Sequence, residues 1–534
     1  MSPFRSTANT KRRVSSPQSL TFIAIPSIRL YTVCMLCRFL PAPRKALAAL
    51  ASLSLALLCQ ACGSSFNEDV FGDASQKGRI FPDPDIVLSS PSAEQPYYRT
   101  NQSLSIEIST PIHGAVIHYA LVGVSDFQAY TGPVTVNYAD NPEYDRRLLV
   151  YVTHPDYADS AISERAYLFL VNGGVITLAG DYDEGFSGDG SPATGAALSS
   201  PFSCVAVGDT VYLSDTGNHR IRRIGPDGII STIAGTGIAG MDPSQEGGPA
   251  TSAQLSSPRG LCVDSGGNLF VADTGNHRIV RIDASGILTT VAGTGISGYI
   301  PTDDGGPAED ALLSSPSGVF AASSGIVYIA DTGNNRIRKI SPAATAGNPD
   351  IISTVAGAGG AGYDPAEDGG SALLARLSSP EGVCMAASGA IYVADTGNNR
   401  VRKLTSGAGA GDPAIISTVA GTGEADYSGT DDGGAAANAR LSGPTGVFLP
   451  SATVLLVADA GNNRVRRIAL SAVIGEPDVI TTIAGSGQDS GFAGDYGLAT
   501  DAVFGAPCGV CVDGDGNLLV ADTDNNRIRA VIYY

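Results

Sequence analysis

The chain has 534 residues, and its 33 Lys and Arg stand against 52 Asp and Glu, for a formal net charge of −19. A chain of this length does not fold around one core, so several domains are expected. The first 61 residues hold eight Lys or Arg and no acid, which leaves 25 basic against 52 acidic residues, or −27, for the rest. Such a surface repels phosphate backbones and argues against nucleic acid as a partner.

The N-terminal 61 residues have the order of an export signal. From Met35, taken as the start, three basic residues precede the apolar run 46–58, and Cys59-Gln-Ala-Cys62 follows. A run of this length is too short to span a bilayer comfortably. The segment resembles a bacterial lipoprotein signal, with Ala61 before the acceptor cysteine, although Cys59 stands where such signals usually have Leu. The resemblance implies lipidation at Cys62 and anchoring to a membrane of the bacterial cell envelope on the exported side. An ordinary cleaved signal and a retained anchor are the alternatives.

Two segments precede the repeats. Residues 62–84 are rich in Gly, Ser and Asp and predict a tether, whereas residues 85–171 hold about six short alternating runs that predict a small β-sandwich. The sequences Ile117-His-Tyr119 and Tyr130-Thr-Gly-Pro-Val134 resemble the chitobiase/β-hexosaminidase C-terminal-type module, which implies a spacer. His113, His118 and His154 are spread over different runs, so ordinary histidines are favoured over a metal site.

One heptapeptide recurs six times in the remaining 360 or so residues. The first copy reads Asp-Thr-Gly-Asn-His-Arg-Ile, and the six copies lie at 215–221, 273–279, 331–337, 395–401, 459–465 and 522–528. A fixed period of this size marks a repeat architecture. Each repeat holds four short runs separated by Gly, Asn, Asp or Ser turns, which predicts a four-stranded antiparallel sheet.

The ends of the repeat region predict a closed ring. Gly174 to Gly180 has the pattern of a fourth strand, and the chain ends at 526–534 with the pattern of a third strand. The last sheet would then combine strands from both ends, which removes exposed sheet edges. We therefore predict an all-β protein in which a six-bladed propeller, residues 173–534, follows the sandwich.

The repeats resemble the NHL repeat, whose family forms β-propellers. The Asn-His-Leu triplet of the family name is here Asn218-His219-Arg220 or Asn334-Asn335-Arg336. Some animal relatives bind RNA through a basic face, and peptidyl-hydroxyglycine lyases with similar propellers use His-bound zinc. Neither property is expected here, because the chain is acidic and only His219 and His277 share one repeat position.

The first and sixth residues of the heptapeptide predict a structural pair across a turn. A ring of arginines that binds an anion is the alternative. The pairs are Asp215 and Arg220, Asp273 and Arg278, Asp331 and Arg336, Asp395 and Arg400, Asp459 and Arg464, and Asp522 and Arg527.

The long loop after each fourth strand carries an aromatic residue or Met and then an acid. The aromatic is expected to hold its loop on the neighbouring sheet; a binding rim and a calcium site are the alternatives. No other cofactor is expected. The binding candidates are Phe186, Tyr299, Tyr363, Tyr427, Phe492, Asp304, Asp368 and Asp432.

Three cysteines, Cys262, Cys384 and Cys511, share a repeat position that elsewhere holds Val or Phe, which predicts an apolar packing site. Cys508 and Cys511 have a Cys-x-x-Cys spacing, but on a strand. Plain core is therefore favoured over a disulfide or a redox pair.

No catalytic motif is present, and no residue in the ring centre clearly breaks the repeat symmetry. We predict a non-enzymatic, monomeric binding scaffold that docks a protein or carbohydrate of the cell envelope on its loops. The rival prediction is a propeller enzyme, a lyase or lactonase with a metal in the central channel. A purely structural assembly piece is the third prediction.

Overall fold

The computed structural model describes residues 85–90, 98–99, 103–110, 115–121, 127–137, 145–153, 160 and 162–533, except 182, 346–347, 408–413, 474 and 489–490. Cys62, His113 and His154 lie outside these residues. Strands and short 3-10 turns make up the regular structure that is described. None of its helices is long and apolar enough to cross a membrane.

The first described part is a two-sheet β-sandwich. One sheet has the order β1 (Asp85–Ser90), β3 (Ser103–Ser109), β6 (Val134–Asn137). The other has the order β2 (Tyr98–Arg99), β8 (Ser163–Leu170), β7 (Asp145–Thr153), β4 (Val116–Leu121), β5 (Gln128–Ala129). The predicted sandwich is confirmed.

Both sheets contribute to the sandwich core, in which Ile106 of β3 and Leu148 of β7 are fully buried. The Tyr130 hydroxyl accepts a hydrogen bond from the Ile108 N–H at 3.1 Å, and its ring meets Tyr119 edge-on. The two motifs that carry the resemblance to the chitobiase-type module therefore contribute side chains to the sandwich core. The resemblance itself stays a prediction. His118 stacks on a tyrosine ring and bonds a threonine hydroxyl.

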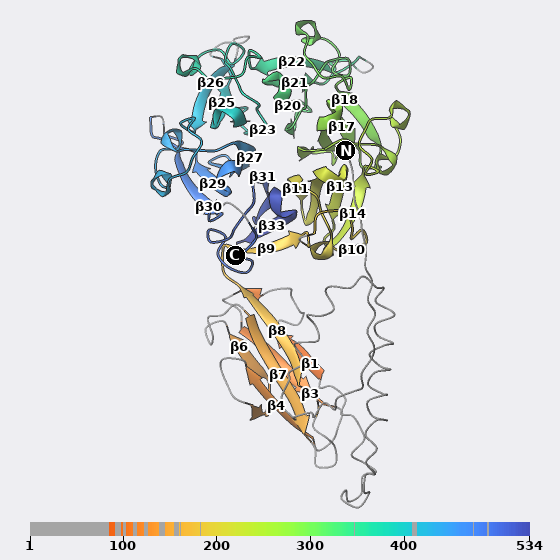
Figure 1. Cartoon of the computed structure of the whole chain (residues 1–534), viewed down its shortest axis with the longest axis vertical. Helices are drawn as coiled ribbons and strands as arrows, with labels where there is room; N and C mark the ends of the chain where they lie inside the picture. Colours follow the sequence, from red (N-terminus) through yellow and green to blue (C-terminus); the bar gives the residue numbers. More distant parts are fainter. Residues whose placement is uncertain are drawn as a thin grey trace, which may run out of the picture. The chain divides into compact units, whose positions relative to one another are not determined.

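The second part is the predicted six-bladed propeller (Figure 1). Blades 1 to 3 are β11 (Pro201–Val207), β12 (Thr210–Asp215), β13 (Arg220–Ile224), β14 (Ile229–Ala234) with the edge pair β10 (Ser191–Pro192); β15 (Leu261–Val263), β16 (Leu269–Asp273), β17 (Arg278–Ile282), β18 (Leu288–Ala292); and β19 (Val319–Ala321), β20 (Val327–Asp331), β21 (Arg336–Ser341), β22 (Ile351–Ala356). Blades 4 and 5 are β23 (Gly382–Met385), β24 (Ile391–Asp395), β25 (Arg400–Thr405), β26 (Ile415–Ala420); and β27 (Pro444–Ser451), β28 (Val454–Asp459), β29 (Arg464–Ala469), β30 (Val479–Ala484).

Blade 6 combines both ends of the repeat region. Strands β31 (Pro507–Val512), β32 (Leu518–Asp522) and β33 (Arg527–Ile532) are completed by β9 (Gly174–Ala179), which pairs with β33. The predicted closure of the ring is confirmed. In Figure 1 the first strands, such as β11, β23 and β31, lie toward the centre, and the fourth strands, such as β14 and β26, lie toward the rim.

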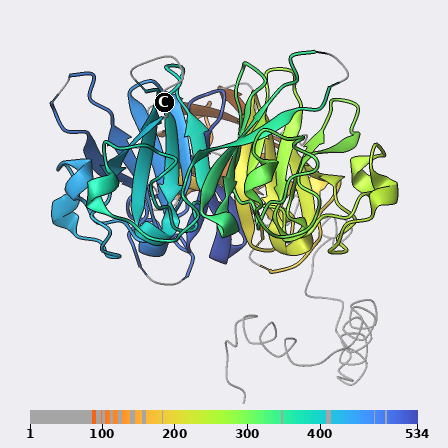
Figure 2. The same cartoon turned by 90° about the horizontal axis from the view of Figure 1, so that it is seen from above.

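The strands run between two faces of the ring, and loops gather on both (Figure 2). In blade 1 the start of β11 pairs with the end of β12, because Pro201 stands opposite Asp215. The connections between blades and the turns between second and third strands therefore share one face, which we call the loop face. The 3-10 turns of these connections and turns are η3 (Ala193–Gly195), η4 (Thr216–Asn218), η5 (Pro243–Gln245), η6 (Ala250–Ser252), η7 (Thr274–Asn276), η8 (Pro301–Asp303), η9 (Thr332–Asn334), η10 (Pro365–Glu367), η11 (Thr396–Asn398), η12 (Gly429–Asp431), η13 (Ala436–Asn438), η14 (Ala460–Asn462) and η15 (Thr523–Asn525).

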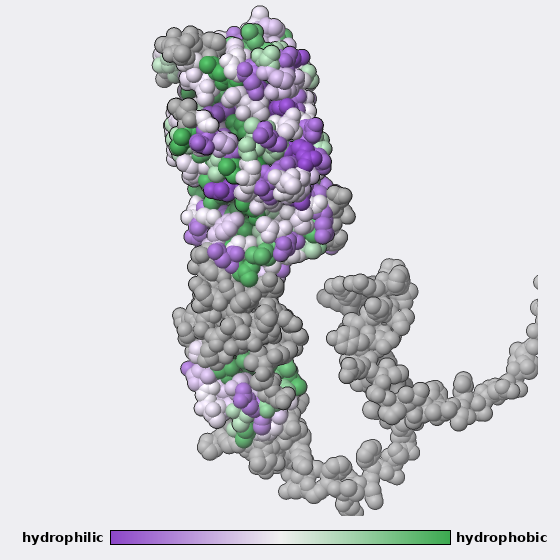
Figure 3. All heavy atoms as spheres, turned by 90° about the vertical axis from the view of Figure 1, so that its left-hand side faces the viewer, coloured by the Kyte–Doolittle hydropathy of each residue, from purple (hydrophilic) through white to green (hydrophobic). Residues whose placement is uncertain are grey.

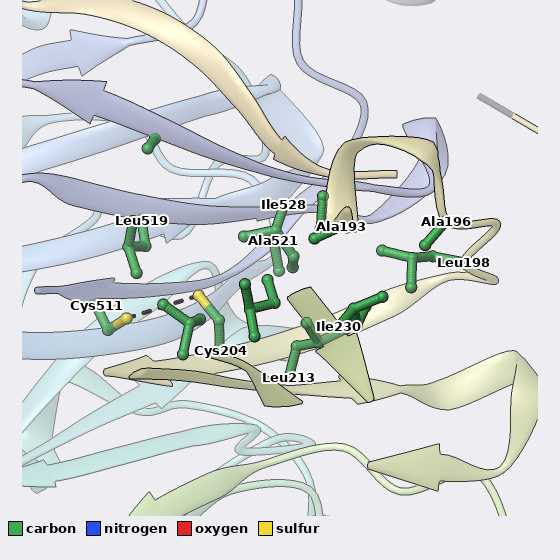
Figure 4. Packing of buried hydrophobic residues seen from close by; sticks show 14 of the residues in the cluster. Ala193, Ala196, Leu198, Cys204, Leu213, Ile230, Cys511, Leu519, Ala521 and Ile528 are labelled. Carbon is green, nitrogen blue, oxygen red and sulfur yellow. Dashed lines mark hydrogen bonds between the residues drawn. The ribbon is translucent and has the colours of Figure 1, made fainter. Parts of the chain in front are cut away.

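The propeller core is divided into one apolar cluster for each joint between neighbouring blades. The cluster between blades 6 and 1, for example, unites Leu519 and Ile528 with Leu213 and Ile230 (Figure 4). Each blade thus buries both faces of its sheet against its neighbours, which explains why the strands have nearly continuous apolar runs.

Candidate functional site

The heptapeptide aspartates are buried, and each stands directly before a turn of the loop face. Asp215 is inaccessible to solvent, and it accepts hydrogen bonds from the Ser199 N–H and the Asn218 side chain, both at 2.8 Å. All six aspartates are placed in this way, and burial raises the pKa of each. The pKa reaches about 6 for Asp331 and Asp522.

The predicted partner arginine is wrong in five of the six repeats. Asp215 stands opposite Arg220 in the sheet, but its ion pair is with Arg222, at 3.1 Å. The same shift of two residues occurs at Asp331 and Arg338, Asp395 and Arg402, Asp459 and Arg466, and Asp522 and Arg529. Only blade 2 has the predicted pair, Asp273 and Arg278 at 2.8 Å, because Val280 occupies the position of the second arginine.

Each of these second arginines also binds the acid of the loop that enters its blade. Arg338 is inaccessible to solvent and lies 2.9 Å from Asp304 and 3.4 Å from Asp331. We call such a set, one buried arginine between two carboxylates, the arginine cluster of a blade. The loop acids of the other clusters are Asp189, Asp368, Asp432 and Asp495, and Glu246 has this place beside Arg278.

The aromatic residues of the loops stack on the first arginines. The Arg336 guanidinium lies 3.7 Å from the centre of the Tyr299 ring, and the Tyr299 hydroxyl donates to Asp304 at 3.3 Å. Phe186, Tyr363, Tyr427 and Phe492 stack in the same way, at 3.5 to 3.9 Å. These contacts hold each loop on the next blade, as was expected for the aromatics. Their binding of a partner, or of calcium by the loop acids, stays a prediction.

The fifth residue of the heptapeptide accepts a hydrogen bond from the neighbouring blade. Both His and Asn can do this, which explains why either residue occurs there. His219 and His277 have φ values of +53° and +52°, and the equivalent asparagines have nearly the same value. The His277 Nδ1 accepts a hydrogen bond from the Ser315 N–H at 3.0 Å, and the Asn335 Oδ1 accepts one from the Ser379 N–H at 2.8 Å. Asn tolerates this left-handed conformation and offers an acceptor at the same reach.

The repeat symmetry breaks at the inner end of the first strands, which sequence reasoning missed. In every repeat the residue after the strand's first proline differs, while the residues around it recur. The six are Phe202, Arg259, Ser317, Glu381, Thr445 and Cys508. A comparison of the repeats position by position could have found them. They lie at the loop-face ends of the six innermost strands, and four of them, Phe202, Ser317, Glu381 and Cys508, line a cavity along the ring axis. We call them the mouth residues.

The mouth residues form a mixed polar and aromatic site. Arg259 lies 3.6 Å from Glu381 and 4.7 Å from the centre of the Phe202 ring. Burial raises the pKa of Glu381. The Ser317 hydroxyl is fully buried, and within the described part of the chain it has no hydrogen-bond partner.

The channel wall below the mouth is made of main chain. At Gly318 the first strand of the next blade comes so close that an added Cβ would lie 2.3 Å from the Glu381 carbonyl oxygen. Gly260 and Gly382 have similar neighbours. The cavity is consequently small, about 120 Å³. Among the described residues, no three His, Cys, Asp or Glu side chains are grouped as a metal site requires.

Four of the six repeats match the family model of the NHL repeat, at residues 255–282, 313–340, 377–404 and 504–530. The chain therefore carries NHL repeats within a six-bladed β-propeller. Human NHL repeat-containing protein 2 is 29% identical over 345 residues, which cover 61% of this chain and 45% of that protein. Human Teneurin-4 is 31% identical over 260 residues, 43% of this chain and 9% of that protein. The chain thus spans less than half the length of these relatives.

A solved structure of an auxiliary nutrient binding protein from Bacteroides ovatus is 13% identical, with a TM-score of 0.49 over 84% of this chain and 98% of that one. A likeness of this size is uninformative about function.

Proposed function

We propose that the protein is a non-enzymatic binding scaffold that docks a protein partner on the loop face, with the mouth residues at the centre of the contact. The observation that carries the proposal is the loss of repeat symmetry at the mouth. A ring needs only repeated residues to close, whereas recognition needs different groups at defined places. Phe202, Arg259 and Glu381 supply an aromatic face and both charges within a few ångströms, and aromatic and arginine side chains dominate protein interfaces.

The size of the cavity favours a protein over a sugar or other small molecule. Pockets for small ligands measure about 300–1,000 Å³, whereas the channel cavity measures about 120 Å³. The cavity fits one inserted side chain rather than a whole ligand. A ring of loops around such a cavity is compatible with a protein interface that has a central anchor.

The charge of the connections between blades favours a partner with a basic surface. The six connections between blades, residues 181–200, 235–257, 293–315, 357–379, 421–443 and 485–506, hold 20 Asp and Glu against two Arg. Six of these acids face the buried arginines, which leaves 14 acids against two Arg. On the side of the propeller shown in Figure 3, hydrophilic and hydrophobic residues are interspersed. Because acids predominate in these connections, complementary charge is expected to steer the partner.

The test is chemical cross-linking of the intact protein in an envelope extract, with the captured protein identified by mass spectrometry. We expect one basic protein to cross-link to the wild type, and its yield to fall at least tenfold in Glu381→Ala and in Arg259→Ala. The matched control is Asp515→Asn in the exposed turn between β31 and β32, away from the loop face, and it should keep the yield. All variants must melt at the wild-type temperature. Equal yields from the mouth variants and the control would overturn the proposal.

We also propose that Cys62 carries a lipid anchor in the cell envelope; the order of the signal residues supports this. Cells fed a labelled fatty acid should label the wild type and not Cys62→Ala, and the variant should leave the membrane fraction. Label that remains on Cys62→Ala would contradict the anchor.

A further inference from the structure

Two cysteine thiols meet at one joint of the ring (Figure 4). Cys204 lies on β11 of blade 1 and Cys511 on β31 of blade 6, and their Sγ atoms are 3.6 Å apart. Both side chains are at most 4% exposed, inside the apolar cluster that contains Leu213 and Leu519. The two residues are 307 positions apart in the sequence, so folding of the whole ring brings them together.

The joint between blades 6 and 1 is where the ring closes. Blade 6 contains strands from both ends of the repeat region, and the hydrogen bonds between β33 and β9 join these two ends. If β33 separates from β9, blade 6 is free to leave blade 1. A covalent bond from β31 to β11 bypasses this pair and holds blade 6 on blade 1.

The pair of cysteines occurs at this joint alone among the six. The positions equivalent to Cys204 hold Leu or Val in the other repeats, and those equivalent to Cys511 hold Val, Phe or Cys. The equivalent pairs are Leu261 with Val205, Val319 with Cys262, Val383 with Phe320, Val447 with Cys384, and Val510 with Phe448. Cys262 and Cys384 therefore have an aliphatic residue where Cys511 has a thiol.

We propose that Cys204 and Cys511 form a disulfide that closes the propeller covalently. Two S–H bonds break and one S–S bond forms. The two electrons and two protons pass to an oxidant of the disulfide class, whose own S–S bond is reduced to two thiols. The sulfur atoms must approach to about 2.05 Å, about 1.5 Å closer than the two thiols stand. Small rotations about the two Cα–Cβ bonds supply such a change.

The surroundings of the pair determine when the bond forms. The hydrogen bond with Cys204, and then burial, raise the pKa of the Cys511 thiol well above its usual range. Since the thiolate is the form that attacks a disulfide, the bond forms while the first strands are still exposed during folding. Afterwards the apolar cluster shields it from reductants. Cys508 is turned elsewhere, because its thiol donates to the Ala506 carbonyl at 3.3 Å.

The test is refolding of the intact chain from reduced, unfolded protein in a mixture of reduced and oxidised glutathione. Free thiols are then alkylated in denaturant, and the peptides are mapped by mass spectrometry without reduction. We expect a peptide that links Cys204 to Cys511, with Cys262, Cys384 and Cys508 recovered alkylated. Recovery of alkylated Cys204 and Cys511, or a link from Cys508 to Cys511, would overturn the proposal.

A second measurement is the melting temperature of the oxidised and the reduced protein. A bond that closes so long a loop should raise the melting temperature by about 5 °C or more. The double variant Cys204→Ala/Cys511→Ala should melt at the same temperature in both conditions. The matched control Cys384→Ala removes a buried thiol without a cysteine partner, and it should keep the wild-type difference in melting temperature. A wild type that melts at one temperature in both conditions contradicts covalent closure.

Discussion

Each blade contains a buried arginine that contacts carboxylates of two different segments. Arg338 touches two carboxylates and lies 5.1 Å from the Tyr299 ring, and its whole side chain is hidden from solvent. Arg336, two residues earlier, has the same chemistry but lies nearer the surface, where it stacks on the ring and donates to carbonyl oxygens. The two residues are a matched pair for separating buried from superficial charge contacts.

We expect Arg338→Met to lower the free energy of unfolding by about 3–5 kcal/mol, because the substitution leaves buried Asp331 without its cation. Arg336→Met should lower it by only about 1 kcal/mol, the size of a surface cation–π contact. Urea unfolding of both variants measures the two losses. Equal losses would show that the cluster around Arg338 is no more important than the surface stack.

Burial of the heptapeptide aspartates also predicts an unusual dependence on pH. The pKa of Asp522 is about 6 in the folded protein, and among the described residues its Oδ2 has no hydrogen-bond partner. An unfolded Asp has a pKa near 3.9. Folding therefore takes up a proton between about pH 4 and pH 6. This contribution to stability is fully present below about pH 4, and it is lost as the pH rises through about 6.

We expect the wild type to lose stability relative to Asp522→Asn as the pH rises from 4 to 6.5, by about 1.4 kcal/mol per unit of pKa shift. The variant lacks the titrating group, so the comparison cancels other groups. Urea unfolding at half-unit pH steps gives the difference, which should be constant above pH 7. A wild type that instead gains stability over this window would mean that the arginine outweighs burial.

Among the elements, β9 has a special position because it joins the two ends of the propeller. Its residue Val175 is fully buried in the joint between blades 5 and 6, and Thr177 donates to the loop acid Asp495 at 2.6 Å. Without β9, the edge of β33 is unpaired and the ring is open. An unpaired strand edge is a site of aggregation.

A chain that starts at Asp181 should therefore lose at least about 4 kcal/mol of stability, or fail to unfold cooperatively, and should aggregate. A chain that starts at Asn172 keeps β9 and serves as the control for loss of the sandwich. Thermal unfolding and size-exclusion chromatography compare the two chains. The same melting temperature for both would show that closure of blade 6 adds nothing.

For the whole molecule, the sequence predicted the fold far better than the site. A heptapeptide repeated six times and two incomplete end strands are sufficient to predict a closed ring of four-stranded sheets. The ion-pair partner of the aspartate was wrong in five of the six repeats because two arginines lie on the same strand face, and only the position of the entering loop decides between them. Repeat spacing contains no information about that loop.

The mouth residues were missed for a related reason. Recurrence was read as structural, and the position after the first proline, where recurrence fails completely, holds six residues of unrelated chemistry, such as Phe202 and Glu381. Their convergence becomes visible only when the ring is closed. The aromatic loop residues were expected to hold their loops on the neighbouring sheet, and the structure shows that each ring does so by stacking on an arginine.

The glycines of the channel wall have a consequence for the divergence of such proteins. Because main chain meets main chain at Gly260, Gly318 and Gly382, the inner diameter of the ring does not depend on the side chain that precedes each glycine. Those preceding positions include Arg259, Ser317 and Glu381. Each can be exchanged by a single codon change while the frame stays the same, so duplicated copies of one gene can acquire new binding preferences through a few substitutions, with little loss of stability.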